Sequence, residues 1–205
     1  MTYTSSCSDE IAELLIHIGR SSRGEDLASP LTAAQWTCLR FFARANRVSR
    51  TPSAFASFQV TTRGTASQTI KTLEEKGLLA RFRSDRDGRS VRLEITEQGH
   101  ETLNADPLAD LMSVIDVIKP KERATFLATL SHLSETLAGL KGAQAFGTCE
   151  ACTHYTSSDG GGYCACIAAE LAPDDVGKLC VNFGSGGVVP RPPIPTNEII
   201  KGRAK

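Results

Sequence analysis

The stretch Gln59–Gly99, QVTTRGTASQTIKTLEEKGLLARFRSDRDGRSVRLEITEQG, decides the fold of this chain. Its first half predicts a helix, because Ala66, Ile70 and Leu73 recur at helical spacing and form one apolar stripe. Gly77 follows at the place where a helix commonly ends in a left-handed residue. The remaining positions of the helix are mostly polar or cationic, so one face is expected to meet solvent or a polar partner.

A basic hairpin follows this helix. Leu79–Phe82 and Ser90–Ile95 predict two short strands, and the Asp-Gly pair between them predicts a tight turn. Five arginines crowd the hairpin: Arg81, Arg83, Arg86, Arg89 and Arg92. A polar helix followed by such a hairpin is typical of a winged helix on DNA. The helix enters the major groove, and the wing reaches the flanking backbone or minor groove.

The local charge favours a nucleic-acid surface. Between Thr32 and Gly99 there are 12 Lys and Arg against 6 Asp and Glu, a net charge of +6, whereas the net charge of the whole chain is zero. The expected DNA contacts are donors and cations on the helix and the wing: Thr62, Arg63, Thr65, Ser67, Gln68, Lys71, Arg83, Arg86 and Arg89. The alternative is a solvated helix and hairpin whose charges only keep the protein in solution.

These residues resemble the core of the MarR family of bacterial transcription regulators. The matching features are LEEKGLL at the end of the helix, DRDGR in the wing and LEITEQG after it, while LTAAQWTCLRFF resembles the family's second helix. The resemblance covers roughly residues 8–140 and implies a winged helix-turn-helix domain. One segment departs from the family pattern, because PSAFASFQV stands where a helix rich in leucine and alanine is usual. Phe55 and Phe58 are expected to fill the same core.

Helices with apolar stripes flank this domain on both sides. An N-terminal helix is expected to begin at Ser8, which is followed by Asp9 and Glu10. Pro120 begins another helix, whose leucines recur at spacings of three and four. Because the winged domain already has its own core, these stripes need another partner. In proteins that this chain resembles, such helices pair across a two-fold axis, which implies a homodimer on a pseudo-palindromic DNA site.

Cys38, within the expected second helix, has two interpretations. We expect it to be buried as a small apolar residue. An oxidant-sensing thiol is the alternative, although among its near neighbours in sequence only Arg40 could lower the pKa of the thiol.

The composition changes at Gly142. Five cysteines follow in the spacing C-x2-C-x11-C-x-C-x13-C: Cys149, Cys152, Cys164, Cys166 and Cys180. Residues 142–183 carry one lysine against five acids, a net charge of −4. A segment this short has little apolar material for a core, so a bound metal can supply folding energy. Residues 142–184 are therefore expected to form a Cys-rich metal-binding module, and residues 185–205 a flexible tail.

Two kinds of metal centre suit these cysteines. One expected ligand set is Cys149, Cys152, Cys166 and Cys180. In that set Tyr155 and Phe183 each stand three residues after a ligand, which resembles the cluster segment of high-potential iron–sulfur proteins and implies a 4Fe-4S iron–sulfur cluster. The alternative replaces Cys166 by Cys164 and suits tetrahedral zinc. Redox-active thiols without a metal are the third possibility.

Taken together, the sequence predicts a mainly α protein with a small β-wing. Residues 1–141 form a winged helix-turn-helix domain with N- and C-terminal dimerisation helices, and the Cys-rich module follows. The expected function is transcription regulation by a homodimer that binds double-stranded DNA and senses redox state, oxygen or iron through its cluster. One alternative is a MarR-like repressor that responds to a small-molecule effector and carries structural zinc. The other is an electron-transfer iron–sulfur protein.

Neither catalysis nor a membrane location is expected. The chain has no recognisable nucleophile–base pair, phosphate loop or nucleotide fingerprint. No apolar run approaches the ~18 residues of a membrane span, and the N-terminus lacks the basic-then-apolar order of a signal peptide. The expected location is the cytoplasm, where thiols stay reduced.

Overall fold

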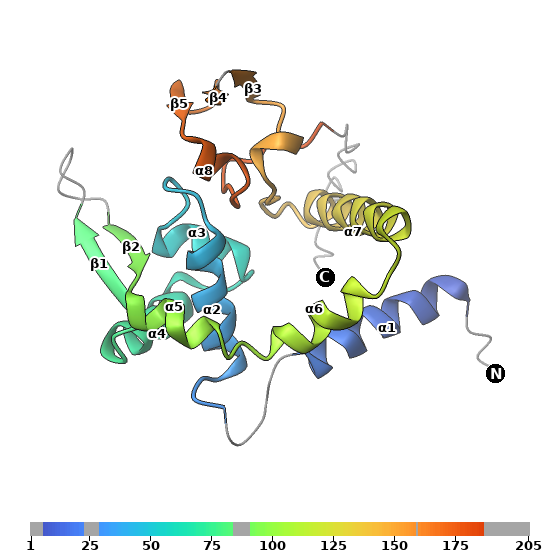
Figure 1. Cartoon of the computed structure of the whole chain (residues 1–205), viewed down its shortest axis with the longest axis horizontal. Helices are drawn as coiled ribbons and strands as arrows, with labels where there is room; N and C mark the ends of the chain where they lie inside the picture. Colours follow the sequence, from blue (N-terminus) through green and yellow to red (C-terminus); the bar gives the residue numbers. More distant parts are fainter. Residues whose placement is uncertain (1–5, 23–28, 84–90, 159, 187–205) are drawn as a thin grey trace, which may run out of the picture.

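The computed structural model of the protein describes residues 6–22, 29–83, 91–158 and 160–186. The chain is mainly helical with a small β-wing, as predicted (Figure 1). The elements up to the wing are α1 (Cys7–Ser21), α2 (Ala33–Arg44), α3 (Pro52–Phe58), α4 (Arg63–Glu75), β1 (Leu79–Arg83) and β2 (Val91–Ile95). The later elements are α5 (Glu97–Leu103), α6 (Leu108–Asp116), α7 (Pro120–Leu140), η1 (Cys149–Ala151), β3 (Tyr155–Ser158), β4 (Gly161–Cys164), β5 (Ala169–Leu171) and α8 (Pro173–Val176).

The winged unit, α2 to β2, is built around an aromatic core. Its largest fully buried side chains include Trp36, Phe41, Phe42 and Phe55. The ring centroid of Phe41 lies 5.5 Å from that of Phe55 and 5.0 Å from that of Phe58. The prediction that both aromatics of α3 fill the core is therefore confirmed, although Phe58 is only partly buried.

Side-chain caps fix where the first helices begin. Thr32 Oγ1 accepts from the backbone N–H of Gln35 at 3.3 Å, and Gln35 Oε1 accepts from that of Thr32 at 3.0 Å. Ser6, not Ser8, caps α1, so that prediction was wrong. A capping box needs an acidic or amide side chain three residues after the cap, and Asp9 stands in that position relative to Ser6.

Both strands of the wing are as predicted. They pair antiparallel, with Leu79 opposite Ile95 and Arg83 opposite Val91. Gly77, at φ +71°, turns the chain out of α4 into β1, a conformation that costs glycine little. The wing is therefore attached directly to the end of α4.

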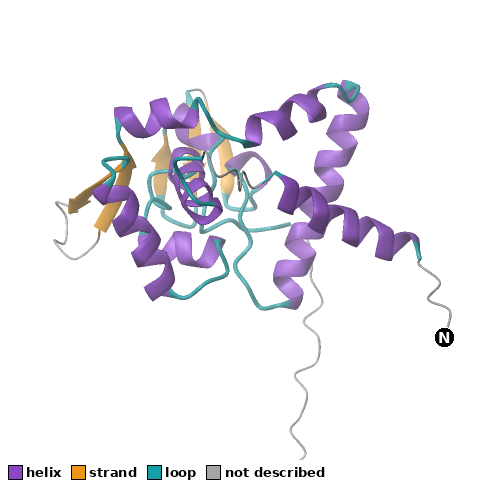
Figure 2. Cartoon of the chain, turned by 90° about the horizontal axis from the view of Figure 1, so that it is seen from below, coloured by secondary structure: helices purple, strands orange, loops and turns teal. Residues whose placement is uncertain are grey.

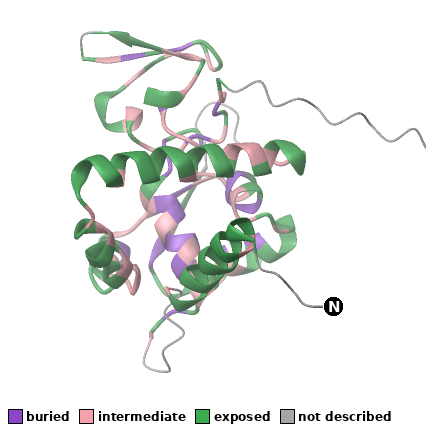
Figure 3. Ribbon diagram, turned by 90° about the vertical axis from the view of Figure 1, so that its right-hand side faces the viewer, coloured by how far each residue is buried: buried purple, intermediate pink, exposed green. Residues whose placement is uncertain are grey.

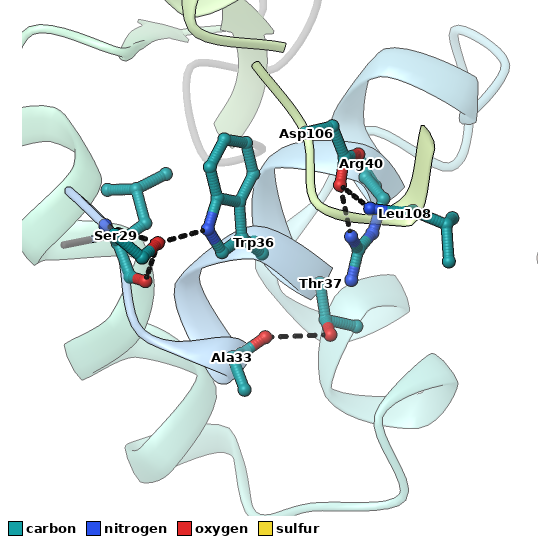
Figure 4. A network of polar contacts seen from close by, with 8 residues as sticks. Ser29, Ala33, Trp36, Thr37, Arg40, Asp106 and Leu108 are labelled. Carbon is teal, nitrogen blue, oxygen red and sulfur yellow. Dashed lines mark hydrogen bonds and ion pairs between the residues drawn. The ribbon is translucent and has the colours of Figure 1, made fainter. Parts of the chain in front are cut away.

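A polar network ties α2 to the segments on either side of the winged unit (Figure 4). Arg40 Nη1 donates to Asp106 Oδ1 at 2.7 Å, and the same oxygen accepts from the backbone N–H of Leu108 at 2.8 Å. Trp36 Nε1 donates to Ser29 Oγ at 2.9 Å. These bonds fix the start of α6 relative to the core of the winged unit.

The outer helices, α1, α6 and α7, lie to one side of the winged unit in Figure 1. None of them has a buried residue, and Figure 3 shows them mostly exposed. Large exposed apolar side chains on them include Leu14, Ile16, Met112, Val114, Leu127, Leu133, Leu137 and Leu140. Within one copy of the chain, the apolar stripes predicted from the sequence are therefore uncovered.

A second sheet lies in the C-terminal part of the chain. Its order is β3-β4-β5, with both pairs antiparallel. Strands occur in the described chain only in this sheet and in the wing, as Figure 2 shows. The sequence reasoning did not predict this sheet.

Candidate functional site

The outward face of α4 carries most of the predicted DNA contacts. The exposed members are Thr62, Arg63, Thr65, Ser67, Gln68 and Lys71. The opposite face is buried through Ala66, Ile70 and Leu73 and packs against α2 and α3. At 100° per residue, Gln68 and Lys71 lie on the side away from this buried stripe. The helix is thus anchored on one side and presents an amide and a cation on the other.

Thr62 is the N-cap of α4. The backbone N–H of Thr65 donates to Thr62 Oγ1 at 3.1 Å, and the two threonine hydroxyl oxygens lie 2.9 Å apart. A capping hydroxyl satisfies a backbone donor that the first turn of a helix otherwise leaves free. The structure therefore gives Thr62 a positioning role that the sequence reasoning did not assign.

Ion pairs fix the wing and use two of its arginines. Arg81 Nε and Nη2 each donate to the Glu74 carboxylate at 2.7 Å, which joins β1 to the last turn of α4. Arg92 pairs with Glu94 at 2.9 Å. These two cations are therefore engaged within the domain.

The other predicted wing contacts are Arg83, Arg86 and Arg89. Arg83 ends β1 opposite Val91, and its side chain is not described. Arg86 and Arg89 lie outside the described residues. Their DNA contacts stay predictions.

In the Cys-rich segment (residues 142–184), backbone hydrogen bonds bring the first three cysteines together. The backbone N–H of Cys152 donates to the carbonyl oxygen of Cys149 at 2.9 Å, which closes the turn formed by η1. The N–H of Tyr155 donates to the carbonyl of Cys152 at 3.2 Å. Tyr155 lies opposite Cys164 in the β3–β4 pair, so Cys164 faces the same turn.

Residues 180–184 contact the segment that contains Cys149 and Cys152. The backbone N–H of Cys180 donates to the carbonyl of Gly147 at 2.9 Å, and that of Gly184 donates to Cys152 Sγ at 3.4 Å. The ring of Phe183 lies so close to Gly147 that a Cβ there would be 2.5 Å from a ring carbon. The absence of a side chain at Gly147 therefore lets the aromatic ring pack directly against the backbone just before Cys149.

The thiols of this group influence one another. Cys149, Cys164 and Cys180 are buried, and Cys152 is half-buried. Burial, followed by neighbouring acidic groups, raises the pKa of the Cys149 thiol to about 11. Those groups are, in decreasing order, Cys180, Cys152, Cys164 and Asp175. As the side chains stand, no three His, Cys, Asp or Glu of the described residues are arranged to hold a metal ion.

Cys166 differs from this group in its exposure. It is exposed, and it is not among the described groups that raise the pKa of Cys149. The thiols that raise the pKa of Cys149 thus belong to the set with Cys164, which the sequence associated with zinc, and they do not include Cys166, which it associated with an iron–sulfur cluster. Metal binding itself stays a prediction.

The Cys-rich segment is joined to the winged unit at the α2–α3 turn (residues 45–51). The backbone N–H of Leu179 donates to the carbonyl of Arg44 at 2.8 Å, and that of Asn46 donates to the carbonyl of Leu179 at 2.9 Å. The N–H of Val181 donates to Ser49 Oγ at 2.8 Å. Asn46 and Ser49 are the buried polar residues of the described chain, and this contact accounts for both. Sequence reasoning missed it, because it joins residues more than a hundred positions apart.

A cleft of about 750 Å³ lies between α1, α6 and the segment before α2. Its lining mixes apolar and polar side chains, including His17, Ile18, Pro30, Asp110, Leu111 and Val114. A concave site of this kind suits a small molecule. The resemblance stated above implies a small-molecule effector in the cleft between the dimerisation helices and the winged domain, and effector binding at this cleft stays a prediction.

Comparisons with known proteins agree with the winged helix. A model of the MarR family matches residues 29–90, which contain α2 to the wing. A MarR-family transcriptional regulator from Silicibacter pomeroyi is 24% identical, with a TM-score of 0.51 over 65% of this chain and 88% of that chain. A MepR–DNA complex from S. aureus is 17% identical, with a TM-score of 0.50 over 64% and 96% of the two chains.

A third solved structure is the transcriptional repressor CouR bound to a 23-mer DNA duplex. It is 20% identical, with a TM-score of 0.50 over 62% of this chain and 92% of that chain. No curated protein matches this chain. None of the helices in the described ranges combines the length and apolarity of a membrane span. The chain therefore contains a winged-helix domain with the fold of MarR-family regulators, and residues 29–90 match that family.

Proposed function

We propose that the protein is a transcription regulator that binds double-stranded DNA as a homodimer. The observation that carries this proposal is α4, a helix anchored by a buried stripe that presents Gln68 and Lys71 to solvent beside a basic wing. The net charge of +6 between Thr32 and Gly99 attracts phosphates to this surface.

The side chains of α4 divide into two roles. Gln68 has an amide that can donate and accept toward an adenine edge in the major groove, and so it is assigned base recognition. Arg63 and Lys71 are cations on the exposed surface of the same helix and are assigned phosphate contacts. Thr62 and the Arg81–Glu74 pair hold the helix and the wing in position.

The outer helices support the homodimer. Their exposed apolar side chains form a surface that a second copy of the chain can bury. A two-fold axis presents two copies of α4, which fits a pseudo-palindromic DNA site. The MepR and CouR structures of this fold were solved with DNA, which also supports the proposed partner.

The cleft beside α1 and α6 favours a second element of this function, a small-molecule effector. Its walls include α6, whose start is tied to α2 through the Arg40–Asp106 pair. A ligand that binds one arrangement of these helices more tightly than another raises the population of that arrangement. DNA affinity then changes to the extent that the two arrangements bind DNA differently. Sensing of redox state, oxygen or iron through the Cys-rich segment stays a prediction from the sequence.

Binding of a fluorescent duplex DNA as a function of salt concentration tests the proposal. We expect affinity to fall steeply as salt rises, because bound cations release the counterions of DNA. Lys71→Ala should lower the slope of log affinity against log salt by about 1. Lys121→Ala, which removes an exposed lysine from α7, is the matched control and should leave the slope unchanged. Equal slopes for all three proteins, or weak binding without salt dependence, would contradict the proposal and favour the electron-transfer alternative.

A further inference from the structure

We propose that Cys149, Cys152, Cys164 and Cys180 bind one zinc ion and that this centre holds residues 179–181 on the α2–α3 turn of the winged unit. The metal site rests on the arrangement of the Cys-rich segment and does not depend on DNA binding.

The four ligands come from three places in the fold. The η1 turn supplies Cys149 and Cys152, the end of β4 supplies Cys164, and the loop after α8 supplies Cys180. A close Cys-x2-Cys pair completed by two distant cysteines is a closed tetrahedral set, as structural zinc sites require. The backbone N–H of Gly184 already donates to Cys152 Sγ, a bond that also orients a metal-bound thiolate.

The Cys-rich segment has almost no apolar core of its own. Among the described residues after Gly147, the buried side chains classed as hydrophobic are Cys149, Cys164, Cys180 and Phe183. Its strands have four, four and three residues, and α8 has four. Elements this short do not fold stably without a core, a disulfide or a metal, and all the cysteines are free. A zinc ion at the centre of these thiols supplies the missing stabilisation.

The position of Cys166 favours zinc over an iron–sulfur cluster. The sequence placed the iron–sulfur cluster on the set that contains Cys166, but this thiol is exposed and is not among the described groups that raise the pKa of Cys149. The set that contains Cys164 in place of Cys166 supplies the four thiolates of a closed zinc site. The exposed Cys166 then serves as an internal control within the same segment.

Binding requires a rearrangement of side chains and a release of protons. The donors are not yet gathered as a metal requires, although backbone hydrogen bonds and strand pairing connect the segments that carry them. A cysteine has a single side-chain torsion, so rotation between its staggered wells moves the sulfur without moving the backbone. Each thiol that becomes a ligand gives its proton to solvent, and Zn²⁺ with four thiolates leaves a complex of charge −2.

Cys180 connects the metal site to the winged unit. Its two neighbours in sequence make the contacts with the turn: Leu179 exchanges backbone hydrogen bonds with Arg44 and Asn46, and the N–H of Val181 donates to the Ser49 hydroxyl. Cys180 stands between the two residues that make these bonds. When its thiolate binds the metal, Leu179 and Val181 are therefore held in place on the turn. Loss of the metal therefore loosens the α2–α3 turn, which determines how α3 leaves α2.

Phe146 adds an apolar contact at the same end of the module. Its ring packs edge-on against Phe58 at 5.3 Å and Phe41 at 6.3 Å between centroids. This contact lies before the first cysteine and does not require the metal. We therefore expect metal loss to free residues 179–181 and leave Phe146 in the core.

The ligand set is tested by metal analysis of the full-length chain. The purified protein is stripped with a chelator under reducing conditions, loaded with Zn²⁺, and dialysed before zinc, iron and acid-labile sulfide are measured. We expect about one zinc per chain in the wild type and in Cys166→Ser, and a loss of that zinc in Cys164→Ser and Cys180→Ser. Three results would overturn the site: no zinc uptake, equal loss in Cys166→Ser, or iron with sulfide in protein isolated without oxygen.

The attachment is tested by amide hydrogen exchange on the wild-type protein with and without zinc, so that no ligand variant needs to fold. Zinc removal should speed exchange at Asn46, Leu179 and Val181 by about tenfold or more, while Ile70 within α4 stays protected. Ser49→Ala should speed exchange at Val181 and retain its zinc, because it removes only the docking bond. Unchanged protection at these three amides after zinc removal would overturn the attachment and leave the metal site standing.

Discussion

At the scale of single residues, the surroundings of each thiol decide what it can do. Cys38 is fully buried in α2, and burial raises the pKa of its thiol far above the ordinary value. A raised pKa lowers the fraction of reactive thiolate at neutral pH, and burial also blocks access by an oxidant. The expectation of a buried apolar residue is confirmed, and the environment is the opposite of the one that an oxidant sensor needs.

Thiol labelling of the folded protein tests this interpretation of Cys38. The exposed Cys7 and Cys166 should be alkylated first at pH 8, and Cys38 should be labelled only after denaturant is added. Peptide mass spectrometry after a time course identifies each site. Labelling of Cys38 at the rate of Cys7 in native protein would contradict its assignment to the core.

Residue roles could be predicted where they depend on neighbours in sequence. The left-handed conformation of Gly77 is local, because it follows from the end of α4, and it was predicted. Ser49 is different, because its hydroxyl is buried only when Val181 packs against it. Nothing in the sequence near Ser49 indicates that contact.

At the scale of elements, periodicity predicted the helices and strands of the winged unit. Ala66, Ile70 and Leu73 are buried on one face of α4, and the strands of the wing have the expected limits within a residue. The sheet β3–β5 was missed because its strands are too short for a clear alternation of apolar residues. Its buried positions are glycine and cysteine, as at Gly162 and Cys164.

The outer helices leave apolar surface uncovered in one copy of the chain. On α7, Leu133 and Leu137 are about half exposed, at 46% and 52%. They stand four residues apart on one face of the helix. In the proposed dimer, this face packs against the second copy.

Replacing Leu137 with lysine tests that packing. The change places a charge in the proposed interface and removes the burial of two leucines per dimer, which costs about 3 kcal/mol or more. The dissociation constant of the dimer should therefore rise about a hundredfold, as measured by sedimentation velocity. Ser131→Lys, an exposed position on the side of the same helix away from Leu133 and Leu137, is the control. Unchanged association of Leu137→Lys would contradict the assignment of α7 to the interface.

At the scale of the whole molecule, two parts of opposite charge are joined by specific contacts. The region Thr32–Gly99 carries a net charge of +6, and residues 142–183 carry −4. The acidic part docks on the α2–α3 turn, while the outward face of α4 stays exposed. The change of composition at Gly142 predicts a boundary between the two parts there, and that boundary stays a prediction. Composition could not predict their docking, which depends on backbone bonds such as that of Leu179 to Arg44.

The segment that joins the two parts also lies near the start of α4. A cleft of about 500 Å³ there is lined by Ser57, Val60 and Arg63 on one side and by residues 142–144 on the other. The end of α7 is therefore close to the helix that is proposed to enter DNA. Residues 142–144, which follow α7 and begin the Cys-rich segment, therefore lie beside the first turn of α4. A movement of either part is expected to act on α4 through these residues.

Selection of DNA from a random duplex pool by the full-length protein tests the central claim most directly. A homodimer that presents two copies of α4 should enrich a pseudo-palindrome whose half-sites are centred about 10 base pairs apart or a multiple of that. Gln68→Ala should relax the preference at one position in each half-site, because the amide reads a base edge. Recovery of no enriched sequence by the wild-type protein, or of the same sequences by the wild type and Gln68→Ala, would contradict DNA recognition through α4.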